Sequence, residues 1–279
     1  MANKILECPK MKQYLDVIDN MYRLGWDERN GGNISVLVDP EEEKEYLDGG
    51  RQYIRDIPLP LVADPIVRDR VFFFTGTGRY FRNTKADPEH NIGVIRISED
   101  GKVAHVIWGF EPNGQFTSEI YAHLMCHATR MKVHPQNHVI MHSHPTNLLI
   151  MSHLMKADDK EFTLALWRAM TECIVVYPEG VGVLPWMLCG TNEIGVATAK
   201  KMEQYRCVIW GLHGIYGAGD DLDEAFGLIE TIEKSAQIWL ACQGKKELYT
   251  ISNDELVQLV HRFGLEKQCA WNFLDRKPE

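Results

Sequence analysis

Hydrophobic residues recur along this chain at two spacings, three to four residues apart in some segments and alternating or continuous over short runs in others. The first spacing marks residues 11–22 and predicts a helix that ends at Gly25. The short apolar runs at 34–38 and 71–75 predict buried strands. Between them, residues 39–70 are rich in charge and proline, so we expect an excursion with little regular structure.

The same interleaving continues through the rest of the chain. Segments 92–98 and 103–109 flank the turn-forming sequence EDGK and predict an antiparallel pair. Further strands are predicted over 138–144, 173–177 and, in two pieces around a turn, within 207–219; helices are predicted over 118–131, 192–204, 222–242 and 252–263, with a helix-rich stretch over 147–170. This alternation indicates an α/β fold with three layers, in which helices cover both faces of a mixed sheet. Since no repeat or linker interrupts the pattern, we expect one domain over residues 1–279.

Charge and composition narrow the class of ligand. The formal net charge is −9 and Lys and Arg form no cluster, which argues against nucleic acid or an anionic membrane as a partner. An anionic ligand must therefore be held by local groups. No run at the start is apolar enough for a signal peptide, so we expect a soluble cytoplasmic protein. The seven cysteines form no CxxC pair, which indicates reduced thiols rather than a zinc site made of cysteines.

The segment VIMHSHP carries the sharpest chemical signal. Residues two apart in a strand point to the same side, about 6.6 Å apart at about 3.3 Å per residue, so His142 and His144 can reach one metal ion. Pro145 then ends the strand, and the pair lies where a sheet commonly presents a site. Two histidines near a strand end without any ligand are the alternative interpretation.

A third histidine, His213, follows the apolar run CVIW and lies between glycines in GLHGIYGAG. Glycines allow the backbone to approach a ligand closely, although a lone histidine is more often structural. Three histidines with an open fourth position are typical of a catalytic zinc site. Neutral imidazoles suit zinc without excluding manganese or cobalt, and the spacing does not select the metal.

Glu119 lies in the first turn of the helix that we expect to start near Thr117. It is a candidate general acid/base close enough to ligate the metal when substrate is absent; the alternative is an ordinary acidic residue that stabilises a helix N-terminus. His123 and His127, four residues apart on the same helix, form a rival metal pair. Because the glutamate of an HExxH motif is missing between them, we interpret them as packing or surface residues.

Three loops contain the backbone amides and short polar side chains that hold a phosphate. They are Asn30–Ser35, with two glycines between asparagines, Thr75–Gly78, and the helix start at Thr117 and Ser118. Each loop alone could be an ordinary turn. TGTG has neither the GxGxxG nor the Walker spacing, so dinucleotide or nucleoside-triphosphate binding does not follow.

Seven motifs together resemble the class II aldolase/adducin-type family, in order from about residue 10 to residue 265. They are WDERNGGN, TGTGRYFRN, TSEIYAH, IMHSHPTN, GVLPWM, LHGIYG and DEAFGLIETIEKSAQI. WDERNGGN and GVLPWM are similar to one subgroup of its ketose-1-phosphate aldolases, and the excursion at 39–70 makes the chain longer than the related fuculose-1-phosphate aldolases.

The resemblance implies a central sheet that is largely antiparallel and a homotetramer with active sites near the subunit interfaces. It implies one Zn²⁺ per subunit, held by His142, His144 and His213, with Glu119 as the acid/base. It implies a phosphate site made of Asn30, Gly32, Asn33, Thr77, Thr117 and Ser118, with Thr77 where the family has serine. Glu172 matches a carboxylate that reaches the active site of a neighbouring subunit.

The implied reaction cleaves a small sugar phosphate, a ketose 1-phosphate, to dihydroxyacetone phosphate and an aldehyde. Zinc stabilises the enediolate in place of a lysine Schiff base, and Glu119 transfers the proton. Two alternatives remain open. One is another enzyme of the same scaffold, such as a fuculose-1-phosphate aldolase, a pentulose-phosphate 4-epimerase or a sugar-phosphate dehydratase. The other is an interaction module like the adducin head, against which the intact histidines and Glu119 argue.

Overall fold

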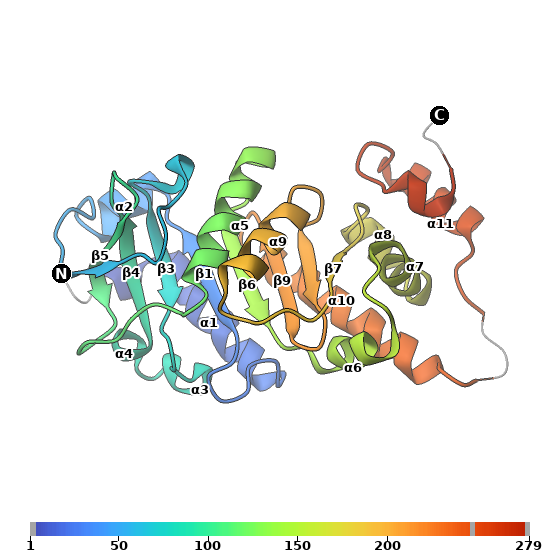
Figure 1. Ribbon diagram of the computed structural model, residues 1–279, viewed down its shortest axis with the longest axis horizontal. Coiled ribbons are helices and arrows are strands. Elements are labelled where there is room, and N and C mark those ends of the chain that lie inside the picture. The colour runs from blue at the N-terminus through green and yellow to red at the C-terminus, as the bar shows by residue number, and fades with distance from the viewer. Residues whose placement is uncertain (1–3, 246–248, 277–279) are drawn as a thin grey trace.

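A sheet of nine strands forms the centre of the described part of the chain, and a group of helices lies beyond one of its edges (Figure 1). The computed structural model describes residues 4–245 and 249–276. The strands are β1 (Asn33–Leu37), β2 (Arg55–Pro58), β3 (Val71–Thr75), β4 (Ile92–Ile97), β5 (Val103–Gly109), β6 (Val139–Ser143), β7 (Gly182–Leu184), β8 (Cys207–Trp210) and β9 (Gly214–Gly219). Their order across the sheet is β2-β5-β4-β3-β1-β6-β9-β8-β7. Only β7 and β8 pair in parallel among these strands, so the mixed, largely antiparallel sheet is confirmed.

Helices cover both faces of this sheet. They are α1 (Pro9–Arg23), α2 (Pro40–Tyr46), α3 (Phe81–Thr84), α4 (Pro88–Asn91), α5 (Ile120–Val133), α6 (Thr146–Leu154), α7 (Asp159–Ala169), α8 (Glu172–Val176), α9 (Asn192–Lys201), α10 (Leu222–Cys242) and α11 (Asn253–Phe263). Helices α5 and α9 lie on one face and α1 and α10 on the other, which confirms the three layers (Figure 1). The assignment of the whole chain to one domain stays a prediction.

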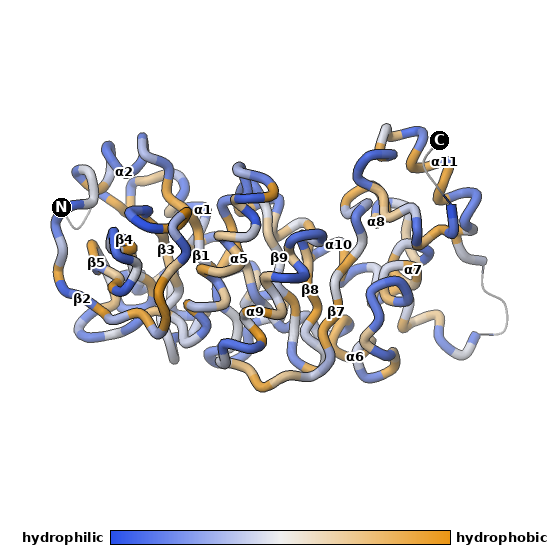
Figure 2. The backbone as a smooth tube through the Cα atoms, turned by 45° about the horizontal axis from the view of Figure 1, so that its top comes forward, coloured by the Kyte–Doolittle hydropathy of each residue, from blue (hydrophilic) through white to orange (hydrophobic). Residues whose placement is uncertain are grey.

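Alternation along the strands divides the core between the two faces. In β1, Ile34 and Val36 pack toward α1 and α10, whereas Asn33 and Ser35 point to the face that α5 covers. In β3, Phe73 belongs to the first core and Phe72 to the core beneath α5. Both faces of the central strands are buried, and this explains why their sequences are almost continuously apolar. Helix α2, by contrast with these strands, is mostly hydrophilic (Figure 2).

The excursion at 39–70 contains more regular structure than the sequence indicated. It holds α2, the edge strand β2 and a 3-10 helix at Pro65–Val67. Strand β2 pairs with β5 through its backbone while only Ile57 is buried, so it has no alternation of apolar residues to reveal it. The prediction of an irregular segment is therefore wrong for β2 and α2.

The strand predicted over 173–177 is also wrong, because these residues form the short helix α8. The β-branched run CIVVY favours a strand locally, but Cys173 and Ile174 are buried in the core that includes α10 and α11. Tyr177, directly after the helix, lies 3.4 Å from Ser235 of α10, measured between the hydroxyl oxygens. The nearest strand is β7, five residues further on, which adds to the edge of the sheet beside β8.

The cysteines and the hydropathy of the helices were two further points raised by the sequence. All seven cysteines are free, and five of them are buried. Within residues 4–245 and 249–276, no helix has both the length and the apolar character needed to cross a membrane.

Glu233 of α10 fixes the start of α6, directly after the HSHP segment. Its carboxylate accepts hydrogen bonds from the backbone N–H of Asn147 at 2.9 Å and of Leu148 at 2.9 Å, and one from the Asn147 side chain at 2.7 Å. These are two of the N–H groups that a helix start leaves without an intrahelical partner. Burial raises the pKa of Glu233, and these hydrogen bonds act in the opposite direction.

Glu233→Gln should lower the free energy of unfolding by about 1–3 kcal/mol, because an amide cannot accept all three bonds and leaves a buried N–H unpaired. Urea denaturation measures the loss. Glu230→Gln, an exposed change one turn earlier on α10, is the control and should cost less than about 0.5 kcal/mol. Equal stability of the two variants would contradict the anchoring role of Glu233.

Candidate metal centre and active site

One cavity of about 160 Å³ brings the predicted site residues together. It lies where β1, β6 and the turn between β8 and β9 meet the start of α5. It is lined by Asn30, Gly31, Gly32, Asn33, Gly76, Thr77, Gly78, Thr117, Ser118, Glu119, His142, His144 and His213. Every residue predicted to hold metal or phosphate is in this set, and so is Glu119.

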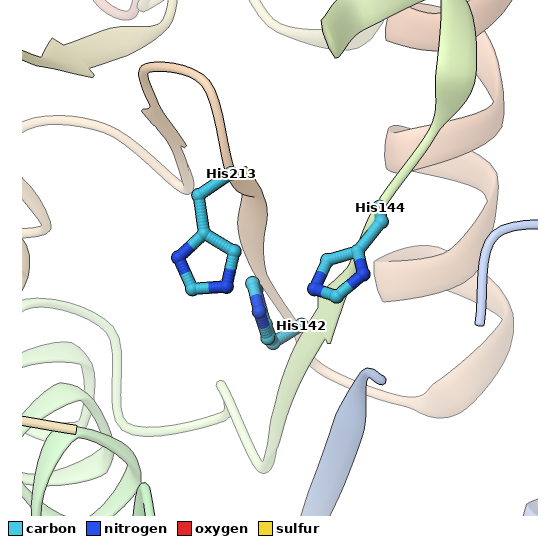
Figure 3. Close-up of side chains that lie close together, drawn as sticks. All are labelled: His142, His144 and His213. Atoms are coloured by element: carbon cyan, nitrogen blue, oxygen red, sulfur yellow. The ribbon is translucent and has the colours of Figure 1, made fainter. Parts of the chain in front are cut away.

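The three histidines converge from two elements (Figure 3). His142 is on β6, His144 lies just after it, and His213 is in the turn between β8 and β9. One nitrogen from each ring lies within 4.8 Å of the corresponding nitrogen of the other two. Since zinc–nitrogen bonds are about 2.1 Å long, a single ion between the rings can bind all three.

The hydrogen bonds of the rings leave the inward nitrogens bare. The Nδ1 of His142 donates to the carbonyl oxygen of Ile215 at 3.0 Å. The Nδ1 of His144 lies 3.1 Å from each carboxylate oxygen of Glu28. The Ile215 carbonyl thus fixes the orientation and tautomer of the His142 ring, and the Glu28 carboxylate does the same for His144. Such partners on the second ring nitrogen are usual for histidines that bind metals.

The Nε2 atoms of His142 and His144 are buried and have no hydrogen-bond partner among the described residues. Burial and the neighbouring histidines hold the pKa of His142 well below its ordinary value, and burial likewise lowers the pKa of His213. Neutral imidazoles with unpartnered lone pairs facing one another are the form that binds a metal. The residues present therefore fit a divalent metal.

Glycine at 214 allows His213 to come this close. A Cβ atom at Gly214 would lie 2.4 Å from the Ser143 carbonyl oxygen, 2.9 Å from the His144 ring and 3.0 Å from the His142 ring. Leu212, on the other side of His213, adopts a positive φ of 62°. The turn is thus shaped around the histidines at some cost in backbone strain.

Glu119 lies beside the three histidines, with its Oε2 atom 3.9 Å from Nε2 of His142. That oxygen accepts two hydrogen bonds, from Asn33 Nδ2 at 3.0 Å and from the Tyr216 hydroxyl at 2.6 Å. Burial, followed by the Glu119 charge, raises the pKa of Tyr216 well above its ordinary value, so the phenol stays a donor. Helix α5 begins at Ile120 rather than near Thr117, which makes Glu119 the residue that precedes the helix.

The three loops predicted to hold a phosphate contribute free backbone amides. Among the described residues, the N–H groups of Gly32, Gly78 and Ser118 have no hydrogen-bond partner, and all three residues line the cavity. Gly32 has a φ of +72°, and a Cβ there would lie 1.5 Å from an Asp27 carboxylate oxygen, so no other residue fits. Unpaired amides at a loop and at a helix start form an anion site.

Glu172, at the start of α8, does not line this cavity. Its side chain is exposed. The predicted role of Glu172 in the site of a neighbouring subunit stays a prediction.

Sequence reasoning missed two residues that contact the site directly and one that lies behind it. Glu28 contacts His144, Tyr216 contacts Glu119, and Ser35 contacts His123 at 2.7 Å. The period-2 pattern of β1 could have revealed Ser35, which points the same way as Asn33. His123 and His127 do not join the histidine cluster; they are fully buried on the face of α5 that packs against the sheet, in agreement with the packing interpretation.

Comparisons with known proteins give the family. Residues 12–240 match the model of the class II aldolase and adducin N-terminal domain. The chain is 45% identical over 272 residues to a rhamnulose-1-phosphate aldolase of Listeria monocytogenes serotype 4b (strain F2365), covering 97% of this chain and 99% of that relative. It is 45% identical over 268 residues to a rhamnulose-1-phosphate aldolase of Enterococcus faecalis (strain ATCC 700802 / V583), covering 96% and 95%.

Among solved structures, the chain is similar to a sugar-phosphate aldolase from Thermotoga maritima. The TM-score is 0.74 at 28% identity, and the match covers 85% of this chain and 96% of that one.

His144→Ala should weaken the binding of a divalent metal by at least about 100-fold, because it removes one of three ligands and lets the Glu28 carboxylate turn away. Metal content after dialysis against a competing chelator measures the loss. His90→Ala, which removes an exposed histidine bonded to Asp87, is the control and should keep full metal content. Full metal retention in His144→Ala would exclude the three-histidine site.

Proposed function

The chain belongs to the class II aldolase and adducin family, and on that premise we propose that it reversibly cleaves L-rhamnulose 1-phosphate to dihydroxyacetone phosphate and L-lactaldehyde. It is a carbon–carbon lyase. Identity of 45% over nearly the whole of two rhamnulose-1-phosphate aldolases supports the substrate. The subgroup to which WDERNGGN and GVLPWM are similar is that of these aldolases, and the reaction would serve rhamnose catabolism.

The observation that carries the proposal is the cavity itself. It has a volume of about 160 Å³ and is lined by the rings of His142, His144 and His213, the first two with a buried and unpartnered Nε2. The Glu119 carboxylate and three unpaired backbone amides complete the lining, which suits the reacting end of a small sugar phosphate. The family is metal-dependent, and we propose zinc, one ion per subunit, bound by His142, His144 and His213. When bound, the metal supplies a Lewis acid for the substrate oxygens on which negative charge develops.

The chain's own residues perform the proton transfer. Asn33 and Tyr216 donate to the same oxygen of Glu119 and hold the carboxylate at the rim of the histidine cluster. From there Glu119 protonates the enediolate carbon to give dihydroxyacetone phosphate and removes the same proton in the aldol direction. Tyr216 remains a donor throughout, because burial and then the neighbouring Glu119 raise its pKa well above the ordinary value of a phenol.

The phosphate of the substrate is held away from the reacting carbons. We propose that the N–H groups of Gly32, Gly78 and Ser118 hydrogen-bond it, together with the side chains of Asn30, Thr77, Thr117 and Ser118. Asn33 lines the same cavity, but its side chain is engaged by Glu119 and His123 and its backbone pairs with His142 in the sheet. Binding energy gathered there can position the carbonyl group at the histidines.

The sequence predictions of a homotetramer, of a Glu172 that acts in a neighbouring site and of a cytoplasmic location belong to the proposal. The first two rest on the family resemblance. Other substrates of the same scaffold remain the alternative, and the adducin-like binding module is disfavoured because the whole acid/base and histidine set is present.

Cleavage of L-rhamnulose 1-phosphate by the purified protein, coupled to detection of dihydroxyacetone phosphate, tests the proposal. We expect activity that chelation with EDTA abolishes and zinc restores. L-Fuculose 1-phosphate, assayed in parallel, controls for the substrate and should react at least about tenfold more slowly at equal concentration. An inactive protein with full metal content would exclude this substrate.

Glu119→Gln should reduce kcat by about 100-fold or more and keep the metal, since it removes the proton donor and none of the three imidazoles. Steady-state kinetics and metal analysis on the same preparation separate the two effects. Glu99→Gln, an exposed change in the turn between β4 and β5, is the control. Loss of metal in Glu119→Gln would instead assign the carboxylate as a ligand.

A further inference from the structure

A row of buried polar side chains runs between α5 and β1 and ends at Glu119. Its members are His127, Ser35, His123 and Asn33. His123 and His127 lie on α5, four and eight residues after Glu119, and four residues of helix rise by about 6 Å. Asn33 and Ser35, two residues apart on β1, are about 6.6 Å apart. The two spacings nearly match, so each helix residue meets a strand residue at the same level.

The hydrogen bonds in this row have one allowed direction. An ionised carboxylate only accepts, so Asn33 must turn its Nδ2 to Glu119 and its Oδ1 to His123. The bond between His123 Nε2 and Asn33 Oδ1 then requires a proton on that Nε2. Nδ1 of a neutral His123 is left as an acceptor for the Ser35 hydroxyl at 2.7 Å.

The direction continues to the far end of the row. Because the Ser35 hydroxyl donates its hydrogen bond to His123, the Ser35 oxygen accepts a hydrogen bond from Nε2 of His127 at 2.8 Å. The Nδ1 of His127 is buried and has no partner among the described residues, in agreement with a bare ring nitrogen there. Burial lowers the pKa of His123 to about 3 and that of His127 well below its ordinary value, so both rings are neutral at neutral pH.

We propose that His127, Ser35 and His123 form a one-directional hydrogen-bond chain that fixes the Asn33 amide and, through it, the acid/base carboxylate of Glu119. None of the three touches the cavity, so they are positioning residues and not catalytic ones. The chain acts together with Tyr216: both donors meet at Oε2 of Glu119, which leaves Oε1 as the oxygen free to exchange a proton with substrate. The inference rests on the proposed function, which assigns proton transfer to Glu119.

Two substitutions at one position separate positioning from packing. His123→Leu removes the donor to Asn33, whereas His123→Gln restores an N–H at a similar distance from the backbone. A carboxylate displaced by about 1 Å can cost up to about 100-fold in rate. We expect kcat to fall at least about tenfold in His123→Leu, with KM changed less than about threefold, and to recover most of the loss in His123→Gln.

Ser35→Ala breaks the chain one link earlier and should also lower kcat, while metal content stays complete. Ser235→Ala is the matched control. Ser235 is a fully buried serine on α10 whose hydroxyl bonds the Ile232 carbonyl at 2.8 Å, outside the site. The two variants should lose comparable thermal stability, but only Ser35→Ala should lose turnover. Equal kcat in the two variants, or equal kcat in His123→Leu and His123→Gln, would overturn the proposal.

The direction of the chain can be measured without substrate. Nitrogen-15 NMR of histidine-labelled, metal-loaded protein should show His123 and His127 as neutral rings protonated at Nε2. A proton at Nδ1 of His123 would reverse the chain and overturn the proposal, whatever the substrate. Absence of rhamnulose-1-phosphate cleavage in a wild-type protein with these tautomers would exclude the substrate proposed above and leave the chain itself supported.

Discussion

The antiparallel pairing of β1 with β6 is the constraint on which the site depends. In this register Asn33 lies opposite His142, so the strand that holds the Glu119 carboxylate and the strand that supplies the first histidine of the proposed metal site are neighbours at the same level. A slip by one residue would turn Asn33 and Ser35 toward α1 and α10 and place Ile34 beneath α5. The apolar residues at 34 and 36 prevent that slip because they are buried in the opposite core.

Neutral groups dominate the interior around this pairing. His123, His127 and His142 are all buried with lowered pKa values, and Tyr216 is held protonated. In such surroundings the carboxylates of Glu119 and Glu28 and a metal, once bound, would be the strongest sources of local electric field. Because the dielectric constant of such a site is low, each charge there interacts more strongly with a bound substrate than it would in water.

Many of the candidate site residues could be identified from the sequence, because they belong to short motifs whose spacing predicts the local backbone conformation. Period-2 spacing placed His142 and His144 on one side, and flanking glycines indicated that His213 could approach them. Contacts between distant segments carry no such local signal, so Tyr216 above Glu119 and Ser35 between two histidines emerged only from the packing of α5 and β9 on β1 and β6. The same limit explains α8, where tertiary burial overrode a β-branched run, and β2, which is a strand through its backbone pairing alone.

Strand order also sets when the sheet can be completed as the chain is synthesised. Strand β1 is the first strand in the sequence, yet it lies in the middle of the sheet between β3 and β6. One of its edges therefore stays unpaired until residues 139–143 have left the ribosome, and that edge belongs to the apolar strand NISVL. An unpaired apolar edge of this kind can pair with strands of other chains. During this stage of synthesis the nascent chain is therefore prone to aggregate, and a ribosome-associated chaperone could shield the edge.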